Sequence, residues 1–227
     1  PANGSPVTVP SQDMVLGLYY MTKLRKSTKA VKILGEGLTF YSPEEVIIAY
    51  NEKCVDLNAQ IRVRTEDFNA EGVLETQLIE TTVGRVLFNE KVPAAAGYIN
   101  EVLTKKSLRD IIHGILKATS VPETASFLDE IKSLGYNFAF KGGLSFSLGD
   151  IIIPQEKYNM IDAANKQVDG IMANYNMGLI TNNERYNQVI DIWTSTNAEL
   201  TELSMKRIRE DQQGFNSVYM MLDSGAR

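Results

Sequence analysis

The chain has 227 residues, a hydrophobic fraction of 44%, a net charge of −5 and a pI of about 5.1. This is the composition of a globular protein with room for one large or two small domains, and it excludes an overall disordered chain. The acidic balance argues against independent binding to a DNA backbone, which needs clustered Lys and Arg.

The longest apolar run and the counts of Cys and His exclude further classes of protein. No apolar run approaches the roughly 18 residues that a membrane-spanning helix needs. The single Cys54 excludes an internal disulfide framework and suits a reducing cytosol. The single His113 argues against a histidine-based metal site or a local Ser-His-Asp triad.

The first 150 residues mix helical and strand patterns. A short apolar helix is predicted over 13–22, and Ser42-Pro43-Glu44-Glu45 predicts a helix start whose helix runs to about Lys53. Apolar and polar residues alternate over 59–64, which is typical of a half-buried strand. A second strand near 75–80 completes a hairpin, and residues 83–92 predict a third strand.

From Ala94 onward the pattern turns helical. One apolar face follows the helical period at Ile99, Val102, Leu103, Leu108, Ile111, Ile112 and Ile115. Val121-Pro122-Glu123 restarts a helix, and the glycine-containing run 141–149 ends it.

The last third shows two heptad patterns. The first comprises Ile161, Ala164, Val168, Ile171 and Tyr175, and the second comprises Tyr186, Val189, Trp193, Thr196, Leu200 and Leu203. Gly178 as a helix C-cap and Thr181–Glu184 as a capping box make the connection short, so the two helices must run antiparallel. The predicted fold class is α+β: a small mixed β and helical N-terminal region, then helices and a projecting antiparallel coiled-coil hairpin.

Local motifs offer little chemistry. The segment Asp67–Gly72 begins like a calcium-binding loop, but Leu78 occupies the position of the bidentate Glu, so a hairpin turn is the better interpretation. Neither His113 nor Cys54 has a positioned acid–base partner nearby in the sequence, so we expect both to be inert.

Four blocks resemble the β′ subunit of bacterial DNA-directed RNA polymerase. They are residues 10–22 (PSQDMVLGLYYMT), 81–85 (TTVGR), 184–193 (ERYNQVIDIW) and 219–227 (YMMLDSGAR). They occur in the order of that family, and the resemblance covers essentially the whole chain. The start without Met and the stop at Arg227 lead us to expect an internal piece of a larger enzyme.

The resemblance implies a role in transcription. Residues 1–150 match the pore region, and 151–227 match the funnel region, with a coiled coil at about 156–211 and an active-centre-proximal tail at 215–227. The implied surroundings are the secondary channel, through which nucleoside triphosphates enter and the 3′ end of backtracked RNA leaves. The implied partners are the rest of β′ and the β, α and ω subunits of a cytoplasmic, DNA-binding nucleotidyltransferase.

The resemblance also implies substrate-binding residues. Arg227 lies, in the family, near the triphosphate of the incoming nucleotide, and Gln12 and Met221 match positions lining the same region. A guanidinium suits this role because its forked donors match phosphate oxygens. Leu222 departs from the Ala of many relatives. No Asp-x-Asp-x-Asp run occurs in the chain, so we expect no catalytic residue, metal ligand or bound cofactor here and place the Mg²⁺ ligands outside this chain.

The predicted hairpin tip is the second expected site. In the family, Gre-type cleavage factors and DksA-type regulators dock on this coiled coil. The corresponding residues are Leu179, Ile180, Glu184, Asn187 and Gln188, and Gln188 replaces a Lys found in some relatives, which would weaken a site for an anionic regulatory nucleotide.

Two other functions are compatible with part of this sequence. A stand-alone coiled-coil adaptor would use the same helices for protein contacts, and Arg227 would then be an ordinary solvated residue. A small hydrolase fails for want of a nucleophile–base pair or metal ligands.

Overall fold

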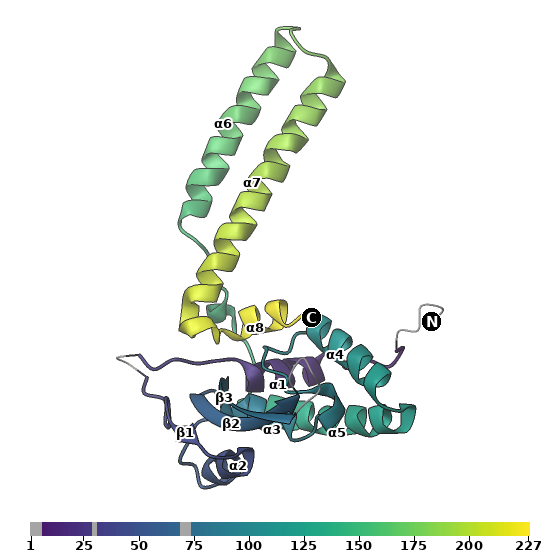
Figure 1. The fold of residues 1–227 in the computed structure, drawn as a ribbon. Helices are drawn as coiled ribbons and strands as arrows, with labels where there is room; N and C mark the ends of the chain where they lie inside the picture. The colour runs from purple at the N-terminus through teal and green to yellow at the C-terminus, as the bar shows by residue number, and fades with distance from the viewer. Residues whose placement is uncertain (1–5, 29–30, 69–73) are drawn as a thin grey trace. The chain divides into compact units, whose positions relative to one another are not determined.

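The computed structural model describes residues 6–28, 31–68 and 74–227, which form two compact units (Figure 1). The first unit comprises the chain up to Ser145 together with Met220–Arg227, and the second comprises Phe146–Tyr219. The sequence placed residues 215–227 with the second region, whereas the contacts of Met220–Arg227 lie with the first unit.

The first unit contains a small sheet and five longer helices among its described residues. Its elements are α1 (Asp13–Thr22), β1 (Thr39–Phe40), α2 (Pro43–Asn51), β2 (Gln60–Phe68), β3 (Leu74–Thr82), α3 (Val83–Asn89), the 3₁₀ helix η1 (Ala94–Ala96), α4 (Lys105–Ala118) and α5 (Val121–Gly142). This mixture confirms the predicted α+β class.

The sheet has the order β1-β2-β3. Strands β2 and β3 pair antiparallel from Gln60↔Thr82 to Phe68↔Leu74, so the predicted hairpin is confirmed. Ile61 and Val63 are fully buried while the alternate Arg62 is exposed, as the period of two requires. The calcium-like segment Asp67–Gly72 lies largely outside the described residues.

The third strand was predicted in the wrong place. Val83–Asn89 form α3 instead, because the Thr82 hydroxyl accepts a hydrogen bond from the Arg85 backbone N–H at 3.3 Å and caps a helix. A short apolar run cannot be assigned to strand or helix from its periodicity alone. The third strand is β1, which pairs parallel with β2 through Thr39 and Phe40.

The helix expected from Ala94 also begins later than predicted. Between η1 and α4 the chain forms no helix, and the Asn89 side-chain amide holds it in place by accepting from the Ile99 N–H and donating to the Ile99 carbonyl, both at 2.8 Å. Helix α4 begins at Lys105, after the capping box of Thr104 and Ser107.

Helix α1 is the centre of this unit, with Val15, Leu18 and Met21 fully buried. It packs on α5 in close backbone contact, since a Cβ added to Gly17 would lie 1.9 Å from the Gly135 carbonyl oxygen. The start of α3 is equally close: a Cβ on Gly84 would lie 1.8 Å from the Met21 carbonyl oxygen. Only glycine fits at such crossings.

The block 81–85 joins three segments of the first unit. Arg85 Nε donates to the Thr22 carbonyl at the end of α1 at 3.0 Å, and its Nη1 donates to Asn100 Oδ1 at 2.9 Å. The Thr81 hydroxyl donates to the same Asn100 oxygen at 2.9 Å. Burial lowers the pKa of the Arg85 guanidinium. These hydrogen bonds fix the path of the chain into α4.

The second unit is dominated by α6 (Glu156–Asn176) and α7 (Asn182–Glu210), which run antiparallel (Figure 1). The shorter elements are the 3₁₀ helices η2 (Leu148–Asp150) and η3 (Asp211–Gly214), and α8 (Ser217–Asp223) follows them. Arg207 and Glu156 form an ion pair at 2.7 Å at the open end of the hairpin.

The seam between the two helices differs in part from the predicted heptads. Ala164 is buried and Val168 half-buried, as expected. On α7, however, Tyr186 is 60% and Trp193 39% exposed, while Ile192 is less exposed than either. The α7 seam therefore runs through Ile192 rather than Trp193.

Across the described parts of the chain, no helix combines the length and apolarity that a bilayer crossing requires.

Candidate functional site

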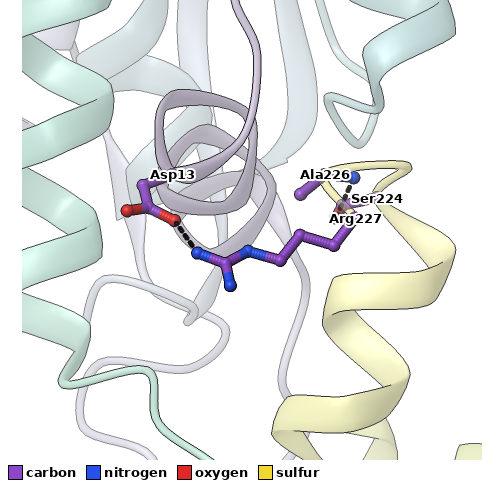
Figure 2. Close-up of polar contacts among 4 residues, drawn as sticks. All are labelled: Asp13, Ser224, Ala226 and Arg227. Carbon is purple, nitrogen blue, oxygen red and sulfur yellow. Dashed lines mark hydrogen bonds and ion pairs between the residues drawn. The ribbon is translucent and has the colours of Figure 1, made fainter.

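The chain's C-terminal residues form a tightly bonded turn after α8. Ser224 is fully buried, and its hydroxyl donates to the Met221 carbonyl at 3.3 Å. The same hydroxyl accepts a hydrogen bond from the Ala226 N–H at 3.2 Å (Figure 2). Gly225 adopts a φ of 71°, a left-handed conformation that favours glycine. These hydrogen bonds hold together the turn formed by Asp-Ser-Gly-Ala, and Arg227 follows directly after it.

Two further hydrogen bonds fasten this turn to the helices of the first unit. The Lys105 N–H, at the start of α4, donates to the Ser224 carbonyl at 2.9 Å. The Tyr19 hydroxyl, on α1, donates to Asp223 Oδ2 at 2.5 Å, and Lys23 Nζ in turn donates to the Tyr19 oxygen at 2.9 Å. The position of Arg227 is therefore set by α1 and α4.

The Arg227 side chain reaches the first turn of α1. Its Nη2 lies 3.4 Å from Asp13 Oδ1, and the two side chains are 63% and 53% exposed (Figure 2). Exposed pairs of this kind contribute only about 0–1 kcal/mol. Most of the five N–H donors of the guanidinium therefore remain available for an anion.

Gln12 directly precedes Asp13 and has an unusual backbone. Its φ is 51°, although it is not glycine, and its side chain is exposed and does not cap α1. Such strained residues cost about 1–3 kcal/mol and cluster at functional sites. The turn brings the Gln12 side chain to the same end of α1 as the Asp13–Arg227 pair.

The structure places the three predicted substrate-binding residues, Gln12, Met221 and Arg227, in different surroundings. Met221 is half-buried on α8 and holds the turn through its carbonyl. Among the described residues, no hydrogen bond or ion pair joins the side chain of Gln12 or Met221 to Arg227. The partner that the sequence missed is Asp13, which lies 214 positions away and carries no local signal of this contact.

The tip of the α6–α7 hairpin is a fully capped turn. Gly178, with a φ of 73°, donates its N–H to the Tyr175 carbonyl, and Leu179 donates to the Asn174 carbonyl, which together form a Schellman motif. The Thr181 N–H and hydroxyl both donate to Glu184 Oε2, at 2.7 and 2.9 Å. These bonds, the backbone one first, lower the pKa of Glu184.

The predicted docking residues differ in what they offer at this tip. Leu179 is 70% exposed, whereas Ile180 is only partly exposed. Asn187 and Gln188 are exposed on α7, and the Glu184 carboxylate is engaged in the capping box. Met177, which the sequence did not single out, is 66% exposed and extends the apolar surface next to Leu179.

Neither place contains a metal site: within the described ranges, no three His, Cys, Asp or Glu residues are arranged to hold a metal ion.

Comparison with known proteins assigns the family. Residues 1–151 match the family described as RNA polymerase Rpb1, domain 3, and residues 180–227 match RNA polymerase Rpb1, domain 4. Proteins named DNA-directed RNA polymerase subunit beta′ are 72% identical in Flavobacterium psychrophilum, 70% in Flavobacterium johnsoniae and 61% in Bacteroides fragilis, each over 100% of this chain. The chain spans 16% of the length of each of these relatives. The chain therefore belongs to the RNA polymerase Rpb1 family, whose bacterial relatives here are β′ subunits.

Proposed function

We propose that this chain is a secondary-channel segment of a DNA-directed RNA polymerase, and that Arg227 binds the phosphates of the incoming nucleoside triphosphate. The observation that carries the proposal is the state of Arg227: an exposed guanidinium on a rigid turn, paired only weakly with Asp13. In nucleotidyl transfer, positioning and charge neutralisation supply much of the catalysis, and a fixed guanidinium provides both.

The remaining parts of the assembly are part of the same proposal. The first unit forms the pore region and the second forms the funnel region, in contact with the rest of β′ and with the β, α and ω subunits. The channel also receives the 3′ end of backtracked RNA. The Mg²⁺ ligands lie elsewhere in β′, and the isolated chain has no polymerase activity.

The hairpin tip is the docking point for Gre-type and DksA-type factors in this proposal. Exposed Met177 and Leu179 offer a small apolar anchor, and the capped turn holds it in one conformation. A rigid apolar centre with a polar rim, here Asn187 and Gln188, is the anatomy of a transient interface.

Single-nucleotide addition by assembled polymerase tests the role of Arg227. Losing a charged hydrogen-bond donor costs about 1.5–3 kcal/mol, so we expect Arg227→Ala to raise the KM for the triphosphate roughly 10- to 150-fold. Arg227→Lys keeps the charge but loses the fork, and we expect an intermediate KM. Asp13→Asn frees the guanidinium and is the matched control, with an expected KM equal to or below that of the unmodified enzyme. An unchanged KM in Arg227→Ala contradicts the proposal.

A further inference from the structure

A large hollow opens in the first unit at the place where β1 stops beside β2. Strand β1 ends at Phe40, opposite Val63, whereas β2 continues to Phe68. The chain leaves the sheet at this point because Ser42 caps the start of α2. Among the described residues, no strand therefore covers this edge of β2 beyond Val63. The hollow has a volume of about 750 Å³, which is within the range of small-molecule sites.

Apolar and aromatic residues form much of its wall. Ile47 of α2 and Val86 of α3 are apolar, and Tyr41 and Tyr98 are aromatic. Burial raises the pKa of Tyr98 to about 12, so this residue stays neutral at physiological pH. A wall of this kind suits the methylene chain of a ligand, and the face of a neutral ring attracts a cation.

The charged residues of the hollow leave an excess of negative charge. Its carboxylates belong to Glu44, Glu66 and Glu90, and the one cation among its described lining residues is Arg64. The guanidinium carbon of Arg64 lies 5.4 Å from the centre of the Tyr41 ring. Within the described residues Arg64 forms no ion pair with any of the three carboxylates. The hollow therefore favours a cation and repels an anion.

The three carboxylates differ in the contacts they already make. Glu90 pairs with Lys91 at 3.0 Å. A hydrogen bond from the Ser42 side chain lowers the pKa of Glu44, which keeps this group ionised. Glu66 is exposed, and among the described residues its carboxylate makes no hydrogen bond or ion pair. Glu66 is thus available to a ligand cation.

Thr65, next to Glu66, carries a buried hydroxyl without a partner. Thr65 lies on the inner face of β2 with Ile61 and Val63, is 5% exposed, and lines the hollow. Its Oγ1 makes no hydrogen bond in the structure. A buried hydroxyl without a hydrogen bond costs free energy, and it can accept one from an ammonium group. The hollow therefore lacks a hydrogen-bond donor beside a free carboxylate.

We propose that this hollow binds a small aliphatic amine, with a primary ammonium group on a short methylene chain. The ammonium pairs with Glu66 and donates a hydrogen bond to the Thr65 hydroxyl, and the methylene chain lies against Ile47 and Val86. A metal ion suits the site less well, since among the described residues no three His, Cys, Asp or Glu are arranged to hold one. The hollow shares no lining residue with the site of Arg227, so the amine site stands even if the role of Arg227 fails.

Photolabelling of polymerase assembled with a full-length β′ subunit that carries this sequence tests the proposal. The probe is putrescine with a photoreactive diazirine in its methylene chain, and mass spectrometry identifies the labelled peptides. We expect label on the peptides that contain residues 41–47 and 64–66. Unmodified putrescine should compete for this label, whereas butanediol, a neutral molecule of the same length, should not.

Two variants test the contacts of the ammonium group. Glu66→Gln keeps the shape and removes the charge, so the half-saturating probe concentration should rise about fivefold, the upper range for an exposed ion pair. Thr65→Val keeps the branched shape without the hydroxyl, and we expect a rise of about threefold. Glu80→Gln is the matched control, because it removes an exposed carboxylate of β3 outside the hollow. Its half-saturating concentration should stay within twofold of the unmodified enzyme.

Thr65→Val also separates ligand binding from a structural role. Because its buried hydroxyl has no partner, a methyl group in its place should leave the melting temperature of polymerase without probe equal or higher. A lower melting temperature would show that the hydroxyl is bonded in the enzyme, and it would overturn the proposal.

The labelling itself can contradict the site in three ways. A hollow without label, as expected if a lysine of a neighbouring subunit fills it, would exclude a free amine as its ligand. Equal half-saturation in Glu66→Gln and in the unmodified enzyme would show that no ammonium pairs with Glu66. Competition by butanediol as strong as by putrescine would show that the hollow does not select a cation.

Discussion

Gly17→Ala is the substitution that most directly tests how the site is positioned. Gly17 lies in the middle of α1, the helix that carries Asp13 at its start and Tyr19 near its end. The added Cβ would lie 1.9 Å from the Gly135 carbonyl oxygen and 2.8 Å from the Ala139 nitrogen on α5. Both are backbone atoms, so no side-chain rotation can relieve the overlap.

The cost of this change follows from those distances. An ordinary non-bonded contact needs about 3.5 Å, so α1 and α5 would have to separate by roughly 1.5 Å. A gap of about 0.5–1 Å already loses a quarter to a half of the dispersion energy along an interface. Overpacking costs about 1–3 kcal/mol and occasionally more, and here we expect about 3 kcal/mol or more.

Thermal unfolding of the chain, followed by circular dichroism, measures this cost. At roughly 2–4 °C per kcal/mol for a chain of this size, Gly17→Ala should lower the Tm by about 6–12 °C. Gly114→Ala on α4 is the matched control: its Cβ would meet nothing within 4 Å, and the better helix propensity should add about 0.8–1 kcal/mol. A Gly17→Ala chain as stable as the unmodified one would refute the close α1–α5 crossing.

Three further outcomes are expected. Tyr19→Phe removes the hydrogen bond to Asp223 and should lower the free energy of unfolding by about 0.5–1.5 kcal/mol in denaturant titration; an unchanged value contradicts that bond. The pKa of Glu184 is lowered from 4.5, so its capping of α7 is complete above this value and is lost as the pH falls through the lower, folded pKa. The protection factors of the tip amides, which are corrected for the intrinsic pH dependence of exchange, should therefore fall in acid, and Glu184→Gln should remove this fall; equal protection profiles would be inconsistent with the capping box. Leu179→Ser should weaken the binding of a Gre-type factor to the assembled polymerase by about tenfold, whereas unaltered affinity would place the docking surface elsewhere.

Much of this fold could be predicted because helix starts and strand alternation depend on residues that are neighbours in the sequence. The helix starts predicted at Ser42-Pro43, at Val121-Pro122 and at Thr181 are confirmed by the structure. Alternation over 59–64 predicted β2, since one face of this strand is buried. Residues 83–92 were misassigned although Val83, Val86 and Leu87 have the helical spacing of three and four residues, because a run this short carries too few apolar positions to establish its period.

The candidate site depended on contacts that no local pattern contains. Tyr19 and Asp223 are 204 residues apart, and Asp13 and Arg227 are 214 apart, so tertiary packing alone brings them together. The family resemblance led us to expect a role for Arg227, and the structure adds its contact with Asp13.

Photolabelling with ATP that carries an aryl azide on its γ-phosphate is the most direct measurement of nucleotide binding by this chain. Assembled polymerase with a DNA template would be irradiated, and the labelled peptides sequenced. We expect label within residues 217–227, competed by unmodified triphosphate and reduced in Arg227→Ala. Label confined to other parts of an active polymerase, with none in this chain, would contradict the assignment of Arg227 to the incoming nucleotide.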